Sequence, residues 1–428
     1  MLHATAGYIY SGQADAPVST PDPKSRELIR SLAHQVRELA GLPEQAEKRD
    51  LWYRHNRLEP ARPLVLVFPE DSWTEVLPAD VLTLDDPFWR THEWYLRHLI
   101  YRHESMHDDF VIEPHFPVNM VFRGTGWGVD VRTETSGVFK GSWVYDPPLK
   151  TEDDIEKITL PTIELDREAT DRIVSTVEDV LGDILDVRPQ SPTMHANLVG
   201  EACAFRGIEQ FMLDMHDRPE WTHRLMDILA EGVDRQTVSL EEQGALTLNN
   251  GHHYVDSGGI GYTDELPAPD FAGERVRLKD RWGFGVAQEA VGIGPDQHEE
   301  FILNYQLRML NRYGLNAYGC CEPYHTKFEM LEKVPRLRRV SISPWCELEP
   351  SAEACRDRWI FSWKPNPARV VGRFDPEVIR RDVRQVLDVA RGCAIEMIHK
   401  DTYTVDHDRT RLETWARIAR EEIDRDCG

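Results

Sequence analysis

Hydrophobic positions follow two alternating periodicities in the C-terminal part of the chain. Phe301, Ile302, Tyr305 and Met309 recur at helical spacing and predict a helix over Pro295–Tyr313. Further helices are predicted over Thr326–Lys333, over Ser351–Arg356, after Asp375 and around Trp415. Short apolar runs between them predict the strands Leu315–Cys320, Arg339–Ser343, Trp359–Trp363 and Cys393–His399. Strand–helix units repeated in this way predict a parallel sheet.

Four strand candidates precede this region: Leu64–Phe68, Phe116–Phe122, Thr193–Val199 and Ala245–Asn250. With the later four they make eight, which favours a closed (β/α)8 barrel, the TIM-barrel fold, over an open doubly wound sheet. Residues 1–60 are predicted to form an N-terminal helical extension, and residues 61–428 the barrel. A stretch rich in Pro, Gly and Trp at 114–148 is predicted to be a long insertion.

Composition restricts the class of protein. The 428 residues are 41% hydrophobic and 29% charged, which fits a folded globular protein. The net charge of −24 opposes nonspecific binding to nucleic acid or anionic lipid, because both are polyanions. No signal peptide or membrane span is recognisable, since the longest apolar runs, such as Pro63–Phe68, are too short. We expect a soluble, cytoplasmic protein that acts on a small-molecule substrate and binds neither nucleic acid nor membranes.

Polar, reactive side chains follow the late strands at the point where each strand ends. The four endings contain Cys320-Cys321-Glu322, then Trp345-Cys346-Glu347, then Lys364, and finally His399-Lys400-Asp401. In (β/α)8 enzymes the active site lies at the C-terminal ends of the strands. Lys364, Lys400 and Asp401 are therefore the candidate catalytic residues, which would bind an anionic group of the substrate or move protons.

The adjacent thiols predict a metal site. Seven cysteines without a Cys-x-x-Cys pair argue against a disulfide scaffold and against a zinc ribbon. Thiolate, carboxylate and imidazole are the ligands of zinc, and catalytic zinc keeps three protein ligands and one open position. The candidate ligands are Cys320, Cys321, Glu322, His325, Cys346 and His399. The alternative is that one cysteine faces the core, because both can bind one ion only if the strand has ended there.

Substrate contacts are predicted from three segments. His252, His253 and Tyr254 follow the strand candidate Ala245–Asn250 and would orient a substrate or complete a metal shell. A polar loop with a satisfied histidine pair explains the same residues equally well. Trp282 and Trp345 are the remaining candidates for substrate binding.

A second motif competes with the thiol site. His103-Glu104-Ser105-Met106-His107 matches the His-Glu-x-x-His pattern of zinc peptidases, in which helical spacing places both imidazoles on one face. The extended pattern would need Gly and His where Phe110 and Glu113 stand, so a solvated helix face is the better interpretation.

The segments from Pro192 onward resemble the uroporphyrinogen decarboxylase superfamily, which includes zinc-dependent methyltransferases that move methyl groups between corrinoid proteins and thiols. The resemblance is carried by the segments Asp280–Gly283, Gly319–Pro323, Ser343–Trp345, Lys364–Pro367 and Lys400-Asp401. It implies a metal-assisted methyltransferase that uses a corrinoid (cobalamin) on a partner protein. Tyr318 stands where the methyltransferases have a zinc-binding histidine, while Cys320 matches their cysteine, so Cys321, Glu322 or His399 would have to complete the ligand set.

Two other functions remain open from the sequence. A decarboxylase or lyase would use the same basic residues to hold the carboxylate of a small substrate. A non-catalytic corrinoid- or metal-binding partner protein would bind tightly without turnover.

Overall fold

The computed structural model describes residues 17–137 and 143–427 and shows an α/β protein built on a seven-stranded parallel sheet. Neighbouring strands follow the order β1-β13-β12-β11-β10-β9-β8. Their bounds are β1 Leu64–Val67, β8 His195–Ala196, β9 Trp282–Gly285, β10 Leu315–Tyr318, β11 Leu337–Ile342, β12 Ile360–Trp363 and β13 Ile395–His399. The order β9 to β13 is also the order along the chain, as consecutive β–α units require.

Three two-stranded sheets accompany the main one. The parallel pair is β2 (His115–Asn119) and β7 (Asp186–Gln190), and β7 continues through four residues into β8 of the main sheet. The antiparallel pairs are β3 (Phe122–Arg123) with β6 (Glu164–Leu165), and β4 (Arg132–Thr135) with β5 (Trp143–Asp146). Within the described residues no strand ladder joins β1 to β2, so the backbone hydrogen bonds do not close into a ring.

Two carboxylates occupy the free edge of β1. The backbone N–H of Val65 donates to Asp109 Oδ2 at 2.8 Å, and that of Val67 donates to Asp108 Oδ2 at 3.0 Å. The N–H of Asp109 donates in turn to the carbonyl of Val65 at 2.7 Å. Since buried backbone groups must find partners, these side chains satisfy the edge where a neighbouring strand would otherwise lie.

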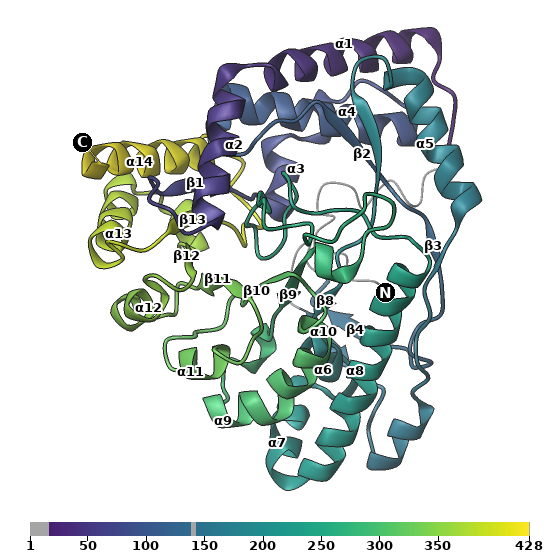
Figure 1. The fold of residues 1–428 in the computed structure, drawn as a ribbon, viewed down its shortest axis with the longest axis vertical. Helices are drawn as coiled ribbons and strands as arrows, with labels where there is room; N and C mark the ends of the chain where they lie inside the picture. The colour runs from purple at the N-terminus through teal and green to yellow at the C-terminus, as the bar shows by residue number, and fades with distance from the viewer. Residues whose placement is uncertain (1–16, 138–142, 428) are drawn as a thin grey trace.

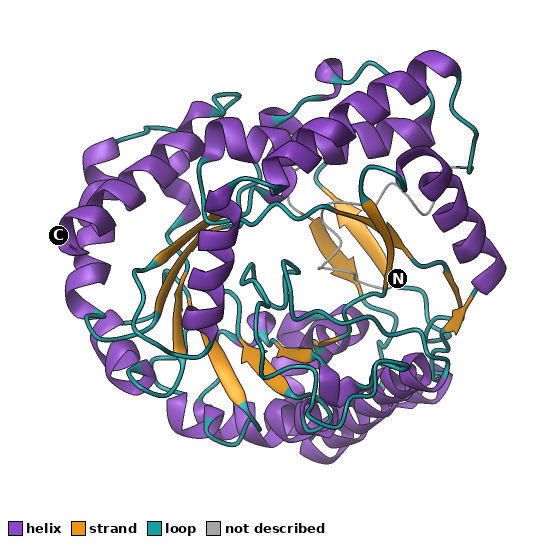
Figure 2. Cartoon of the chain, turned by 45° about the horizontal axis from the view of Figure 1, so that its top comes forward, coloured by secondary structure: helices purple, strands orange, loops and turns teal. Residues whose placement is uncertain are grey.

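Helices surround the strands (Figure 2), and α13 and α14 lie beside β13 and β1 (Figure 1). The α-helices are α1 Pro23–Ala40, α2 Pro43–Asn56, α3 Trp73–Val76, α4 Pro87–Tyr101, α5 Arg167–Leu181, α6 Leu198–Arg206, α7 Ile208–Asp217, α8 Pro219–Glu242, α9 Pro295–His298, α10 Asn304–Leu310, α11 Phe328–Leu331, α12 Leu348–Cys355, α13 Pro376–Val389 and α14 Thr410–Cys427. Short 3₁₀ or π turns span Glu70–Ser72, Ala79–Val81, Arg102–Met106, Glu152–Lys157, Leu278–Asp280, Gln288–Ala290, Glu299–Leu303 and Pro367–Val370. No described helix combines the length and the apolar character needed to cross a bilayer.

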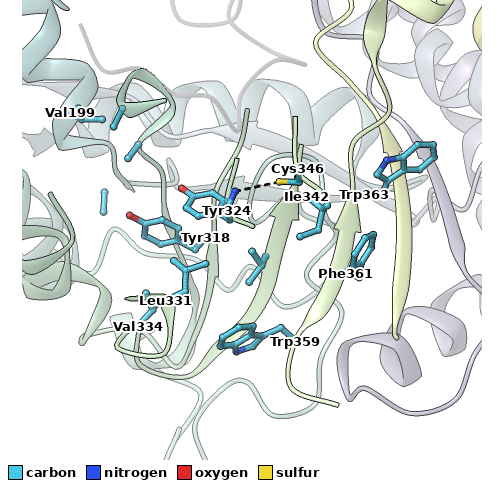
Figure 3. Packing of buried hydrophobic residues seen from close by; sticks show 14 of the residues in the cluster. Val199, Tyr318, Tyr324, Leu331, Val334, Ile342, Cys346, Trp359, Phe361 and Trp363 are labelled. Atoms are coloured by element: carbon cyan, nitrogen blue, oxygen red, sulfur yellow. Dashed lines mark hydrogen bonds between the residues drawn. The ribbon is translucent and has the colours of Figure 1, made fainter. Parts of the chain in front are cut away.

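The two faces of the main sheet carry different side chains. On the outer face, Tyr318, Ile342 and Phe361 pack into the large hydrophobic cluster under the helices (Figure 3). On the inner face the strands carry buried charges: Arg339 Nε lies 2.9 Å from Glu396 Oε1. Glu396 Oε2 lies 3.1 Å from Nε2 of His55, at the end of α2. The second N-terminal helix therefore reaches the inner face at the N-terminal end of the sheet.

Most predicted elements are confirmed, and the differences have local causes. Strands form within a few residues of the predictions at β1, β2 and β10 to β13. The prediction for Ala245–Asn250 is wrong, because the side-chain amide of Asn249 bonds both the N–H and the carbonyl of Trp282, at 2.9 and 3.1 Å, in place of a ladder. The strand predicted at Thr193–Val199 shrinks to β8, and strands β7 and β9 were missed. The segment predicted as an insertion begins with β2, which pairs with β7.

Candidate functional site

The C-terminal ends of three strands bring reactive side chains together. Cys320 and Cys321 follow β10, Lys400 and Asp401 follow β13, and Glu70 follows β1. All three strands run in the same direction, so their C-terminal ends share one edge of the sheet. The contacts among these residues define the candidate site, which we call the thiol cluster.

The turn after β10 sets the direction of both thiols. Gly319 has φ of +96°, and a Cβ atom there would lie 2.5 Å from the ring of Tyr324, so this position favours glycine. Strand alternation stops at this turn, and the Sγ atoms of Cys320 and Cys321 lie 3.4 Å apart. The carboxylate of Glu322 fixes the turn by accepting from the N–H groups of Cys320 (3.0 Å) and Ala287 (2.8 Å) and from the Tyr324 hydroxyl.

Lys400 connects the thiol of Cys320 with the carboxylate of Asp401. Its Nζ donates to Cys320 Sγ at 3.2 Å and to Asp401 Oδ1 at 2.9 Å. The hydrogen bond from Cys321 and the ammonium of Lys400 together lower the pKa of Cys320 to about 7, against the effect of burial. The pKa of Cys321 is raised, because its proton is held against the Cys320 sulfur and because the thiol is buried. One thiolate between two donors is therefore the favoured state near neutral pH.

Glu70 is a member of the site that the sequence analysis missed. Its Oε1 lies 3.9 Å from Lys400 Nζ, and its side chain is 13% exposed. Burial raises the pKa of Glu70 to about 8, and Asp401 and Cys320 add to the effect while Lys400 opposes it. The only signal in the sequence is its position just past the strand at Leu64–Val67, the same rule that identified the later residues.

A short hairpin that packs on the inner face of the main sheet brings Ser257 to the thiol cluster. Tyr254 and Ile260 form an antiparallel bridge, and the N–H of Gly261 donates to the carbonyl of His253 at 3.0 Å. At the tip, Gly258 has φ of +102° and packs against Ile398 of β13. Ser257 Oγ then donates to Cys320 Sγ at 3.2 Å. Sequence reasoning had no means of finding this contact between residues 63 positions apart.

The thiol cluster fits a metal ion. Cys320 Sγ, Cys321 Sγ and a carboxylate oxygen of Asp401 all lie within 4.8 Å of one another. Cys321 Sγ is 3.4 Å from Asp401 Oδ2, and the two sulfurs are also 3.4 Å apart. In a tetrahedral zinc site with Zn–S bonds of about 2.3 Å, two sulfur ligands lie roughly 3.8 Å apart. Small side-chain rotations therefore suffice, and Asp401, predicted as catalytic, stands among the possible ligands.

The other predicted ligands lie elsewhere. Cys346 is buried in the outer hydrophobic cluster, where its Sγ accepts from the N–H of Tyr324 at 3.4 Å (Figure 3). His399 packs edge-on against Trp415 of α14, with ring centroids 4.9 Å apart, so it too lies on the outer face. His325 Nε2 lies 3.6 Å from Glu347, and Glu322 is committed to its turn.

Lys364 lies on the inner face, next to the buried charges. Its Nζ donates to Ser362 Oγ, and Ser362 donates to Glu396. Burial lowers the pKa of Lys364, with Asp256 and Glu396 opposing the shift. It belongs to the inner polar layer, and the charge of Lys400 lowers its pKa further.

The predicted substrate-binding residues fall into three settings. His252 and His253 stack with ring centroids 4.7 Å apart and are partly accessible. The Tyr254 hydroxyl accepts from Arg102 at 2.9 Å, and Trp282 is buried at the N-terminal end of β9 with its Nε1 donating to the Gly261 carbonyl at 2.9 Å. Trp345 is 65% exposed, after the C-terminal end of β11. Only Trp345 therefore follows a strand at the edge that carries the thiol cluster.

The peptidase motif does not form its site. The helix ends within it: Arg102–Met106 is a π turn and His107 has φ of +50°. His103 Nδ1 lies 3.1 Å from Glu44 of α2. Among the described residues, the one group with metal-binding geometry contains neither histidine.

Comparisons with known proteins leave the family open. No family model matches the chain, and no curated protein sequence does. Among solved structures, a methyltransferase from Methanosarcina mazei superposes with a TM-score of 0.47 at 10% identity, covering 87% of this chain and 97% of that one. Because the TM-score is below 0.5, the proposals that follow rest on the geometry of the site.

Proposed function

We propose that this chain is a zinc-dependent methyltransferase that moves a methyl group between a small-molecule substrate and a corrinoid carried by a partner protein. One observation carries the proposal: Cys320, Cys321 and Asp401 offer three ligand atoms within 4.8 Å at the C-terminal edge of a parallel sheet. Such a set leaves one position of a zinc ion open for a substrate. The corrinoid, and membership of the uroporphyrinogen decarboxylase superfamily, enter through the sequence resemblance.

The charges of the thiol cluster support a divalent cation. Two thiolates and one carboxylate carry three negative charges, which a zinc ion and the Lys400 ammonium would balance. Lys400 Nζ already lies 3.2 Å from Cys320 Sγ and 2.9 Å from Asp401 Oδ1. Since buried charge is tolerated only when it is compensated, the ion would complete a neutral site.

The reaction needs a nucleophile and a way to move one proton. Zinc, when bound, keeps a coordinated thiol as an anion and so keeps it nucleophilic. Lys400 holds Cys320 Sγ and Asp401 in place, and Ser257 Oγ donates to the same sulfur at 3.2 Å. Glu70, with a pKa of about 8, exists in both protonation states near neutral pH. It can accept the proton that a substrate thiol loses and return it in the reverse direction.

We also propose a complete (β/α)8 barrel and a cytoplasmic location. The sequence of strands β1, β2, β7 with β8, and then β9 to β13 follows the chain, as in a barrel. The Asp108–Asp109 segment would take the place of a ladder between the first two strands. Free thiols at Cys320 and Cys321 remain reduced in the cytoplasm, which supports that location.

Decarboxylation of a small carboxylated substrate is the second candidate, and one observation favours it. Glu70 is a buried carboxyl group that can hold a proton at neutral pH, 3.9 Å from the Lys400 ammonium. Lys400 would hold the substrate carboxylate, the carbon–carbon bond would break to release CO2, and Glu70 would protonate the resulting carbanion. This reaction needs neither zinc nor a corrinoid.

Metal content tests the first part of the proposal. We expect about one zinc per chain in protein purified without chelators, and none in the C320S/C321S double variant, because Ser is a much poorer ligand. The matched control is Cys393→Ser, since Cys393 is also a partly exposed free thiol but donates to the carbonyl of Ala352. Equal zinc in all three proteins would contradict the site.

Methyl transfer is then measured directly. The zinc-loaded protein is mixed with methylcobalamin and a panel of thiols, and the loss of the methyl–cobalt bond is followed in the visible spectrum. We expect turnover with at least one thiol, abolished in C320S/C321S and retained in Cys393→Ser. Release of CO2 from a carboxylated substrate without a corrinoid, lost in Glu70→Gln, would transfer the assignment to the decarboxylase.

A further inference from the structure

Arg281 is a buried cation without an anionic partner. The residue is 3% exposed and directly precedes β9. Its Nη1 donates to Ser191 Oγ at 3.1 Å and its Nη2 to the carbonyl of Pro192 at 3.4 Å. Its Nε has no hydrogen-bond partner. Among the described residues, no carboxylate lies within ion-pair distance of its guanidinium.

The other buried arginines are all paired. Arg102 lies 2.5 Å from Asp108, Arg206 lies 2.6 Å from Asp214, and Arg339 lies 2.9 Å from Glu396. Arginine is almost never buried without such a partner, because the charge loses its hydration and gains nothing in return. Arg281 departs from the pattern of this same protein, which indicates that its partner is a ligand.

Two histidines lie next to Arg281 and offer further donors. Asn249, three residues before His252, bonds the backbone of Trp282, the residue that follows Arg281, which brings this loop to Arg281. The rings of His252 and His253 stack with centroids 4.7 Å apart, and the charge of Arg281 also lowers the pKa of His253. Burial is the main cause of the low pKa of both histidines, although both side chains remain partly accessible. His253 Nδ1 has no hydrogen-bond partner.

The acidic groups near these histidines are already engaged. Glu113 lies 3.0 Å from Arg49 and accepts from the Tyr262 hydroxyl at 2.5 Å. Asp186 lies 2.5 Å from Arg188 and 3.9 Å from His115. Neither carboxylate lies within ion-pair distance of Arg281, so the nearby acids do not balance its charge.

We propose that Arg281, His252 and His253 form a binding site for the oxyanion group of a small molecule, either a carboxylate, a phosphate or a sulfonate. The planar guanidinium presents paired N–H donors that match two oxygens of such a group. Neutral imidazoles add N–H donors without adding charge. The site goes beyond the proposed methyl transfer, and its test does not use that reaction, so either proposal can fail without the other.

The hairpin that carries Ser257 connects this site to the thiol cluster. His253 stands four positions before Ser257, and Ser257 Oγ lies 3.2 Å from Cys320 Sγ. Arg281 precedes β9 and the thiols follow the parallel strand β10, so the two sites lie at opposite ends of these strands.

Anion binding is measured by isothermal titration calorimetry on the full chain. The probes are inorganic phosphate, methanesulfonate and acetate, each at constant ionic strength in chloride, and the three arms identify the preferred class. We expect saturable binding of at least one probe, and at least tenfold weaker binding in Arg281→Met. Arg281→Lys should also weaken binding, because lysine keeps the charge but lacks the paired N–H donors of the guanidinium. Absence of saturable binding by all three, or unchanged binding in Arg281→Met, would overturn the site.

Thermal unfolding separates a ligand site from a structural role. Without anion, Arg281→Met should raise the midpoint temperature, because the variant removes an unpaired buried charge. The matched control Arg206→Met should lower it, because Asp214 loses a buried partner. The preferred anion should raise the midpoint of the wild type but not that of Arg281→Met. If Arg281→Met is destabilised as much as Arg206→Met, Arg281 is structural and the proposal fails.

Discussion

The sulfur atoms of Cys320 and Cys321 lie 3.4 Å apart, although the two residues are neighbours in the sequence. Neighbouring residues of a continuing strand point to opposite faces of the sheet. Gly319 ends the alternation with φ of +96°, and Glu322 holds the following turn through two backbone N–H groups. The pair of thiols therefore depends on the turn that Gly319 opens and Glu322 holds.

Replacing Gly319 with Ala should separate the thiols. The new Cβ would meet the Tyr324 ring at 2.5 Å at a positive φ, so we expect a loss of about 1–3 kcal/mol in the free energy of unfolding together with loss of zinc. Gly392→Ala is the matched control, since Gly392 has φ of +89° but no neighbouring atom within 4 Å of the place its Cβ would take. It should cost about 1 kcal/mol and retain zinc. Urea unfolding and metal analysis measure both effects, and equal behaviour of the two variants would contradict the role of the turn.

Cys320 should be the reactive thiol of the metal-free protein. Its pKa is lowered to about 7, first by Cys321 and then by Lys400, whereas burial raises the pKa of Cys346. The rate of iodoacetamide labelling, resolved by mass spectrometry, should rise with pH through about 7 at Cys320 and stay low at Cys346. Lys400→Met should move the Cys320 transition to higher pH. An unchanged profile would show that Lys400 does not stabilise the thiolate.

Glu70 should make the folded protein less stable as the pH rises. Its pKa rises from 4.5 to about 8 on folding, so the native state binds more protons than the unfolded state in this window, and the stability falls towards alkaline pH. Glu70→Gln should flatten the slope of the unfolding free energy between pH 5.5 and pH 8, measured in urea. Glu75→Gln is the control. Despite burial, backbone hydrogen bonds from Val405 and His407 lower the pKa of Glu75, so this control should leave the slope unchanged.

Asp109 should be essential for the edge of β1. It is fully buried and accepts from the Val65 N–H at 2.8 Å, from Arg62 and from Arg420. Asp109→Asn should cost about 3–5 kcal/mol, because it removes the buried carboxylate that Arg62 and Arg420 share. Despite burial, hydrogen bonds with Arg62 and the charge of Arg420 lower the pKa of Asp109, so its contribution should be lost as the pH falls below 3.8.

The control for Asp109 is an exposed ion pair. Asp183 lies 2.6 Å from Arg30, and its side chain is 65% exposed. Asp183→Asn should therefore cost at most about 1 kcal/mol. Urea unfolding at neutral pH compares the two variants. Similar losses would mean that the edge of β1 does not depend on the buried carboxylate.

The parallel order of the late strands could be predicted because its signals are local. Apolar runs and helical periodicity lie within a few residues of each other, so β10 to β13 and their helices were found near their true positions. The rule that chemistry follows the ends of parallel strands placed Cys320, Cys321, Lys400 and Asp401 together. The sequence patterns do not predict segments that pair through side chains. Asn249 is an example, because its side-chain amide bonds the backbone of Trp282 where a strand ladder was predicted.

Which side chains of each strand face inward was decided only by the tertiary structure. The sequence shows that Glu396 and Ile398 share one face of β13 and that Met397 and His399 share the other, but both faces are buried. Packing of His399 against Trp415 of α14 makes its face the outer one, which removes that imidazole from the site. Contacts such as that of Ser257 with Cys320, or that of Arg281 with Ser191, join residues far apart in the chain. They follow from the path of the folded backbone, because no local periodicity records which distant side chain stands opposite.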